Sequence, residues 1–404
     1  MTTAINNEHK KLNFSSEREQ SQVYLNSAEH EKNQGQKVLN VPNLRFPEFQ
    51  GEWEMCKLGD YGKVVTGNTP PTKDSENYEN GTYLWASPAD LGTIKSITET
   101  KTMLSAQGFS KTRTLPKGSV LVTCIGSTIG KAGMATKEMS TNQQINSIVV
   151  NDNNDNEFVY YAIQSAFPRY LSSIAVQAVP IISKSAFELL PNNRPYLQEQ
   201  KKIGKFLSML DERIATQNKI IDKLQSLIKG IAQKIVRNNK PNVRLAECLE
   251  YKSSTLQESE VCEQGTYPVY GANGIVGYLD NYSTEGEAVY IIKDGSGVGT
   301  VSCVTGKCSA TGTLNTLQAK EGYSLQFFYY MLKVFNFEPY KTGMAIPHIY
   351  FKDYGKAKVF CPSYTEQLQY ARLLSAIDSK LSVEKNALRN LSLQKQYLLR
   401  QMFI

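Results

Sequence analysis

The sequence has few of the residues from which metal sites, catalytic triads and disulfide frameworks are built. Only three of the 404 residues are histidine, and the seven cysteines are odd in number and contain no Cys-x-x-Cys pair. A histidine metal site, a Ser-His-Asp triad or a zinc ribbon therefore has almost nothing to draw on. This use of cysteine also disfavours a disulfide framework and is typical of a reducing compartment. We expect a cytoplasmic protein without a metal site.

Long apolar stretches and catalytic motifs are also lacking. No apolar run approaches the roughly 18 residues that span a membrane, and the N-terminal stretch contains no signal-peptide core, so we expect no membrane association. The nucleophile-elbow, H-E-x-x-H and EF-hand patterns do not occur. We find neither the Asn/Asp-Pro-Pro-aromatic signature of amino-methyltransferases nor a convincing acidic-acidic-Lys nuclease triad. These absences favour a binding protein over an enzyme and predict no cofactor for this chain.

Two glycine-rich segments invite comparison with nucleotide-binding loops. Gly126–Ala132 is one residue too short for a phosphate loop, and Ala132 stands where a magnesium-binding hydroxyl is needed. Gly295–Thr300 is followed by the strand-like segment Val301–Thr305, so no helix N-terminus follows it to hold a pyrophosphate. We interpret both segments as tight turns between strands.

The two glycine segments belong to a tandem duplication. Gly126–Gly130 recurs as Gly295–Gly299, and Phe158–Tyr161 recurs as Phe327–Tyr330, each 169 positions later. At a spacing of 167 positions, further matches pair Pro180 with Pro347, Pro195 with Pro362, Glu199-Gln200 with Glu366-Gln367, and Asp211 with Asp378. One small loop deletion accounts for the drift, so each half of the chain carries the same structural unit.

Each unit reads as a mixed α+β domain followed by a long helix. The segments Ser119–Ile125 and Glu287–Ile292 are apolar and β-branched and run into the glycine turns, which predicts strands. Short helices are expected at Glu157–Ala166 and Ser324–Val334. The predicted organisation is a polar tail over 1–40, a first domain over 41–195, a central helix over 196–240, a second domain over 241–362 and a C-terminal helix over 363–404. The tail includes a stretch from Ser15 that is compatible with a short helix.

The two long helices carry heptad patterns that predict a coiled coil. In both, apolar residues repeat at a and d positions for several heptads, with the polar Gln217 and Glu384 at corresponding places. Antiparallel packing of the two helices relates the halves by a pseudo-twofold axis; the alternative is that each helix packs only on its own domain. The predicted seam residues are Leu207, Leu210, Ile214, Ile221, Leu224, Ile228, Leu374, Ile377, Leu381, Leu388, Leu391 and Leu398.

Polar and basic residues near the glycine turns are candidates for contact with DNA. Lysine and arginine neutralise phosphates, whereas amide and hydroxyl side chains can read base edges. In loops such residues are more often simply solvated, so no single position is specific. The candidates are Lys111, Arg113, Ser127, Thr128, Lys131, Asn142, Gln143 and Gln144 in the first half, and Tyr270, Asn273, Tyr278, Lys293 and Ser296 in the second.

The order domain, helix, domain, helix resembles the specificity subunit of type I restriction–modification enzymes. The resemblance covers nearly the whole chain from about Val41. It rests on Trp53–Gly59 and its counterpart Val243–Glu247, the turns at Gly126 and Gly295, Tyr267–Gly271, and the helix-leading segments Pro195–Ile203 and Pro362–Gln367.

This resemblance implies a non-enzymatic DNA reader. Each domain would read one half of a split target in double-stranded DNA, and the helices would set the gap and bind two modification subunits. Those partners would flip and methylate adenine with S-adenosylmethionine, and restriction subunits would join them for cleavage that depends on ATP and Mg. Because the two domains differ in sequence, the target is expected to be asymmetric.

Two other functions remain open on the residues alone. A self-contained DNA methyltransferase or nuclease with duplicated reading domains would need a cofactor or carboxylate motif, and binding of S-adenosylmethionine by the chain alone would reveal it. A coiled-coil scaffold without DNA affinity is the second alternative. Failure to be retained on a phosphate-rich column at moderate salt would favour it.

Overall fold

The computed structural model describes residues 39–92, 94–173 and 180–404. The polar tail predicted for residues 1–40, with its helix from Ser15, lies almost entirely outside the described residues. Within those residues, no helix is both long enough and apolar enough to cross a membrane.

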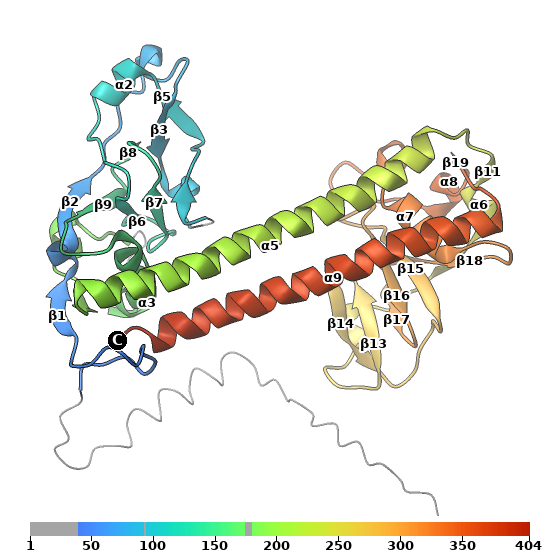
Figure 1. Cartoon of the computed structure of the whole chain (residues 1–404). Coiled ribbons are helices and arrows are strands. Elements are labelled where there is room, and N and C mark those ends of the chain that lie inside the picture. The colour runs from blue at the N-terminus through green and yellow to red at the C-terminus, as the bar shows by residue number, and fades with distance from the viewer. Residues whose placement is uncertain (1–38, 93, 174–179) are drawn as a thin grey trace, which may run out of the picture.

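Two long helices cross the whole molecule side by side and run in opposite directions (Figure 1). They are α5 (Leu197–Arg237) and α9 (Tyr364–Gln401). Their pairing follows from the heptad spacing, because it places an apolar stripe along each helix where the two helices face each other. The antiparallel arrangement is confirmed by the ion pair between Lys395 Nζ and Asp211 Oδ1 at 2.6 Å, which joins the C-terminal part of α9 to the N-terminal part of α5.

Local sequence explains where the helices begin. The hydroxyl of Ser363 accepts a hydrogen bond from the backbone N–H of Glu366, and the Glu366 carboxylate accepts one from the Ser363 backbone, which is a complete capping box. Helix α5 starts directly after Pro195 and Tyr196, and its last turn carries Lys234 and Arg237, whose charges suit the negative helix C-terminus.

The first domain, residues 39–195, contains a five-stranded sheet, a three-stranded sheet and a short two-stranded sheet. Helix α3 (Asn156–Ser173) packs between this domain and α5. The larger sheet has the order β2 (Gly62–Thr66), β9 (Ile145–Val150), β6 (Val120–Thr123), β7 (Ala132–Ala135) and β4 (Ser96–Ile97). The others consist of β5 (Thr102–Leu104), β3 (Tyr83–Ala86) and β8 (Ser140–Thr141), and of β1 (Glu54–Lys57) with β10 (Pro191–Arg194). Short helices are α2 (Ala106–Ser110), α4 (Lys184–Glu188), η1 (Leu58–Tyr61), η2 (Ser75–Asn77) and η3 (Pro88–Asp90).

The second domain, residues 241–362, repeats this topology with fewer strands. Its four-stranded sheet has the order β12 (Leu249–Ser253), β18 (Leu314–Ala319), β15 (Glu287–Ile292) and β16 (Val301–Thr305). The smaller sheets consist of β14 (Gly274–Leu279), β13 (Tyr267–Gly271) and β17 (Ser309–Ala310), and of β11 (Val243–Arg244) with β19 (Lys358–Val359). Short helices are α6 (Leu245–Cys248), α7 (Leu325–Leu332), α8 (Phe351–Tyr354), η4 (Glu258–Glu260) and η5 (Glu338–Tyr340). In both domains the central strand of the small sheet pairs in parallel with the second strand after the glycine turn, β3 with β8 and β13 with β17. The duplication read from the sequence is therefore a duplication of fold.

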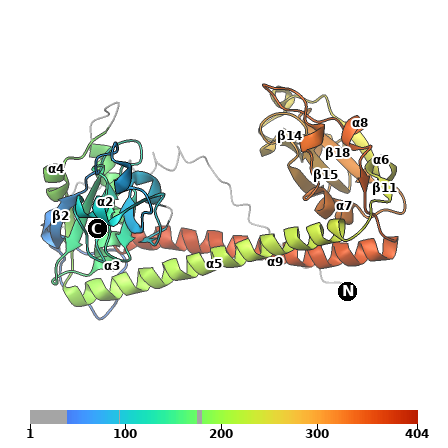
Figure 2. The same cartoon turned by 90° about the horizontal axis from the view of Figure 1, so that it is seen from above.

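Each domain shares its hydrophobic core with one end of the helix pair. The first core includes Leu207 from α5 and Leu398 from α9, and the chain end contributes Phe403, whose ring lies 5.4 Å from that of Phe158. The second core includes Ile228 and Leu374. Consequently each domain contacts both helices, and the view from above shows both domains projecting to the same side of the helix pair (Figure 2).

Candidate nucleic-acid interface

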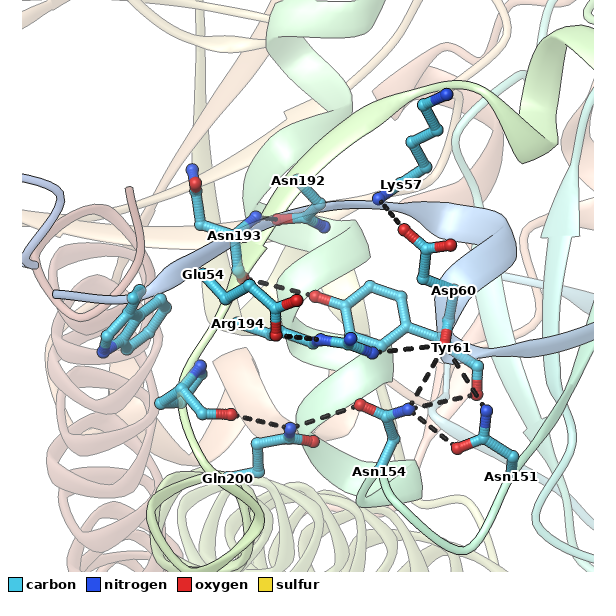
Figure 3. Close-up of polar contacts among 12 residues, drawn as sticks. Glu54, Lys57, Asp60, Tyr61, Asn151, Asn154, Asn192, Asn193, Arg194 and Gln200 are labelled. Carbon is cyan, nitrogen blue, oxygen red and sulfur yellow. Dashed lines mark hydrogen bonds and ion pairs between the residues drawn. The ribbon is translucent and has the colours of Figure 1, made fainter.

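A buried glutamine at the start of α5 attaches the helix to the first domain. Gln200 Nε2 donates to the side-chain oxygen of Asn154 at 3.2 Å and to the carbonyl of Pro195 at 2.9 Å. Its Oε1 accepts from the backbone N–H of Asp155 at 3.0 Å. The Asn154 amide in turn donates to Asn151 and to the carbonyl of Tyr61, so the network reaches the edge of the sheet (Figure 3). A fully bonded buried amide of this kind holds one relative orientation of helix and domain.

The second half repeats the same attachment. Gln367 Oε1 accepts from the backbone N–H of Ser324 at 2.9 Å, and its Nε2 donates to the carbonyl of Pro362 at 3.0 Å. Gln200 and Gln367 therefore make equivalent bonds to equivalent backbone groups. The repeat had already matched these two glutamines in sequence, but their role emerges only from the contacts.

A polar cluster between α3 and the helix pair fixes the first domain further. The Tyr161 hydroxyl donates to Asp211 at 2.6 Å, and Lys395 of α9 bonds the other oxygen of that carboxylate. Lys95 Nζ bonds Glu157 at 2.7 Å and Ser208 at 2.8 Å. Burial, and then the neighbouring Asp211, raise the pKa of Tyr161, which therefore stays a neutral donor.

The corresponding cluster of the second domain is looser. Tyr330, the repeat partner of Tyr161, lies 3.5 Å from Asp378 and 3.4 Å from Ser375. Burial raises the pKa of Tyr330 to about 12. Both clusters hold the domains on the helices, so we assign them a positioning role and not a chemical one. Within residues 39–92, 94–173 and 180–404, no group of three or more His, Cys, Asp or Glu side chains is arranged to hold a metal ion.

Several of the candidate DNA contacts lie together on the first domain. Asn68 joins two of them, because its Nδ2 donates to the carbonyl of Lys111 at 2.9 Å and its Oδ1 accepts from the backbone N–H of Arg113 at 2.8 Å. Thr69, the next residue, donates its hydroxyl to Gln143 Oε1. Lys111, Arg113 and Gln143 are all exposed, so the structure forms one polar surface from residues far apart in the chain. Within it the Lys111 ammonium bonds Asn77 at 2.9 Å and pairs with Asp74 at 3.7 Å.

The Gln143 amide is oriented by that bond. Its oxygen is engaged by Thr69, whereas its NH2 group has no hydrogen-bond partner among the described residues. A fixed amide with free N–H donors suits an acceptor on a base edge. Neighbouring Asn142 is buried, and its side chain forms hydrogen bonds with Gln144. Asn142 therefore stabilises the loop and is not available for a DNA contact.

The glycine turn of the first domain places its candidates on two different surfaces. Ser127 is exposed and Thr128 half-buried at a turn whose Gly126 has φ +94°, a conformation that favours glycine. The turn is joined to the segment that precedes α4 by a hydrogen bond from Gly126 N to Pro180 O at 3.1 Å. Lys131, at the end of the turn, instead lines a cleft between this domain and the helices α5 and α9.

In the second domain the candidates are more dispersed. Lys293 and Ser296 flank the turn at Gly295, and Ser296 is exposed. Asn273 is exposed at the hairpin between β13 and β14, and Tyr278 lies on β14. Tyr270 packs its ring 5.7 Å from that of Tyr290, which makes it chiefly a packing residue.

Sequence reasoning missed three features of these surfaces. Asn68 and Thr69 orient the exposed candidates but carry no motif that marks them. In the duplication, the segment 341–348 beside Lys293 was matched to the first half only at Pro347. Arg45 binds the buried carboxylate of Glu199 with two hydrogen bonds of 2.8 and 2.7 Å, a contact that no local sequence pattern predicts.

Comparisons with known proteins agree with this architecture. The family model of the type I restriction modification DNA specificity domain matches twice, over residues 50–226 and 238–392. The HindI specificity subunit of Haemophilus influenzae is 29% identical over 186 residues, which cover 44% of this chain and 40% of that protein. The EcoprrI specificity subunit of Escherichia coli is 22% identical over 363 residues, covering 81% of this chain and 88% of that protein.

The fold is also shared with a solved structure. The S subunit of a type I restriction–modification system from M. genitalium superposes with a TM-score of 0.65 at 20% identity, over 90% of this chain and 99% of that one. Since the family model covers most of both halves, this chain belongs to the family of type I restriction modification DNA specificity domain proteins.

Proposed function

We propose that this chain is the DNA-recognition subunit of a type I restriction–modification complex. Each domain reads one half of a bipartite target in double-stranded DNA. The observation that carries the proposal is the duplication itself: two copies of a family specificity domain lie at opposite ends of one helix pair and project to the same side of it in the view from above. Two readers held at a constant distance select two half-sites at a constant gap.

The helix pair supplies the spacing. At 1.5 Å per residue, α5 is on the order of 60 Å long, and each end of the pair is bonded to one domain through Gln200 or Gln367. The reading surfaces differ, because Gln143 and Gln144 in the first domain correspond to Gly312 and Thr313 in the second. The target is therefore asymmetric.

The outer faces of the helices suit protein partners. Exposed apolar side chains remain on both helices after the seam is formed, and solvent-exposed apolar groups gathered on one element mark interaction surfaces. They include Phe206, Met209, Ile220 and Leu227 on α5, and Leu373, Val383, Leu393 and Tyr397 on α9. Two modification subunits bind here, one on each side of the pseudo-twofold, and restriction subunits join through them.

In this assignment the chain itself is non-catalytic and acts in the cytoplasm. S-adenosylmethionine, ATP and Mg belong to the partner subunits. The buried polar clusters at Tyr161 and Tyr330 are consistent with this, because each is occupied by contacts between domain and helix.

Methylome sequencing tests the proposal. Cells that carry the modification subunits are compared with and without this gene, and we expect methylation at one split, asymmetric motif only when the gene is present. The purified chain alone is expected to transfer no methyl group and to bind DNA weakly. Methyl transfer by the isolated chain, or an unchanged methylome, would contradict the assignment.

A further inference from the structure

A loop of the second domain exposes two apolar side chains at its tip. Residues 341–348 connect η5 to the segment before α8, and within them Met344 is fully exposed and Ile346 is 66% exposed. Exposed apolar groups raise the free energy of the folded protein in water relative to burial. Such a pair at a loop tip is therefore typical of a surface that becomes covered by a ligand.

The loop is held in one conformation. Thr342 and His348 exchange backbone hydrogen bonds of 2.9 and 2.8 Å, which closes the loop like a small hairpin. Gly343 has φ +87°, and a Cβ at this position would lie 2.3 Å from the carbonyl oxygen of Ile346. The His348 ring nitrogen Nδ1 lies 3.2 Å from that same oxygen. Met344 and Ile346 are thus presented on a preformed tip.

The loop is fastened to the glycine turn that carries candidate DNA contacts. Gly295 N donates to Pro347 O at 3.0 Å, and Ile349 N donates to Lys293 O at 2.9 Å. The first domain makes the same two bonds, from Gly126 to Pro180 and from Ile182 to Cys124. Helix α8, which follows the loop, lies farther from the helix pair than α7 does (Figure 2).

Lysines and carboxylates near the tip are equal in number, but Lys293 and Lys352 are free of ion pairs among the described residues and can bind backbone phosphates. Lys352 Nζ lies 5.0 Å from the centre of the Tyr350 ring. The nearby carboxylates are Asp294, Asp353 and Glu338, of which Glu338 is paired with Lys341 at 2.6 Å.

We propose that Met344 and Ile346 form an apolar wedge that enters duplex DNA between two base pairs of the half-site read by the second domain. The inference rests on the proposed function and deepens it. Apolar side chains of this kind unstack a base step, and flanking cations then hold the kinked backbone. The energy of deforming that step depends on its sequence, so the wedge contributes to target choice without a hydrogen bond to a base.

The test uses the full-length chain in complex with its modification subunits and duplexes of the target found by methylome sequencing. In Met344→Ser/Ile346→Ser we expect affinity to fall by about tenfold or more, comparable to a mismatched base pair. The slope of log affinity against log salt concentration should not change, because no phosphate contact is removed. With 2-aminopurine placed at each half-site position in turn, fluorescence should rise at one step for the wild type and not for the serine variant.

Two further variants separate insertion from general damage. Met344→Leu/Ile346→Val keeps the apolar volume and should bind like the wild type. Met55→Ser changes another exposed methionine, on β1 of the first domain, and should also bind like the wild type. Unchanged DNA affinity of the serine variant would overturn the wedge. So would a serine variant that no longer binds the modification subunits but keeps its DNA affinity, because the tip would then be a protein-binding surface. If the wild-type complex shows no preference for any DNA, the proposed function and the wedge both fail.

Discussion

Buried amides join the domains to the helices. Gln200 and Gln367 each satisfy one backbone donor of the domain and one carbonyl of the turn before the helix, in matching geometry. Removing one partner of such a group lowers the free energy of unfolding, since a buried N–H or C=O left unpaired has no water to replace the lost partner. One side chain in each half therefore contributes a well-defined part of the attachment of the reading domain.

Replacing Gln200 with leucine should lower the free energy of unfolding of the first domain by roughly 1–3 kcal/mol, the cost of stranding its buried partners. Both tryptophans of the chain, Trp53 and Trp85, lie in this domain, so their fluorescence during urea unfolding reports it selectively. Gln198→Leu, on an exposed position of the same turn, is the matched control and should change little. Equal effects of the two substitutions would contradict the role of the buried amide.

Gln143 offers a test of base reading at the same scale. Gln143→Ala removes an oriented pair of N–H donors without touching the core, so we expect relaxed sequence preference at one position of the half-site read by the first domain, with a loss of about 1–3 kcal/mol in discrimination. Methylome sequencing of cells that carry the variant measures this sequence preference. The second half-site should be unaffected, and a uniform loss at both half-sites would indicate that Gln143 does not read a base.

At the scale of elements, the helix seam has an apolar stripe interrupted by one polar pair. Seven of the twelve predicted seam residues are buried and five half-buried, and the buried ones lie where a domain also covers the helices. Between these ends Gln217 of α5 donates to the carboxylate and to the carbonyl of Glu384 on α9. Hydrogen bonds from Lys380 and Gln217 lower the pKa of Glu384, which keeps it ionised. A polar pair inside a seam specifies register at some cost in stability.

Removing one partner or both should have opposite effects. Gln217→Leu leaves a carboxylate against an apolar side chain and should lower the melting temperature by a few degrees. Gln217→Leu with Glu384→Leu should melt at or above the wild-type temperature, because well-packed apolar replacements of buried polar pairs are neutral or stabilising. Since the folded-state pKa of Glu384 is lowered, its contribution is present above the carboxylate's ordinary pKa and is lost as pH falls. The difference in melting temperature between the wild type and the single variant should accordingly become smaller in acid. A double variant that melts below the single variant would refute the pairing.

For the whole molecule, the described chain nearly closes on itself in the first domain. Leu44 N bonds Gln401 O at 2.8 Å, and Phe403 packs its ring 6.2 Å from Trp53. The core of the first domain thus combines its own residues with both helices and with the C-terminal end of the chain. In the repeat, Leu398, Met402 and Phe403 correspond to Ile231, Ile235 and Val236 at the end of α5.

That correspondence predicts the behaviour of half the molecule. A chain of residues 41–240 should form an antiparallel homodimer, in which Ile231, Ile235 and Val236 of each copy fill the place of the missing C-terminal residues in the other. Gln217 would then face a second Gln217, and Asp211 would lose Lys395, so we expect the dimer to be less stable than the whole chain. With modification subunits it should direct methylation to a palindrome of the first half-site. Sedimentation measures the association, and a strictly monomeric fragment would contradict the seam.

Properties that depend on neighbours along the chain were determined by the sequence itself. The heptads of α5 and α9 and the strands before the turns at Gly126 and Gly295 follow from local periodicity, which responds to the side chains a few positions away. The duplication follows from direct comparison of the two halves of the sequence. The family resemblance followed from the order of these units.

Only the tertiary structure decided which remote residues meet. It paired Gln217 with Glu384, put Phe403 into the first domain, gathered Gln143 with Arg113 around Asn68 and Thr69, and sent Lys131 to a different surface. It also buried Asn142 while leaving its neighbour exposed. The physical reason is that these contacts join segments tens to hundreds of residues apart, and their geometry depends on how whole sheets and helices pack, which no local pattern encodes.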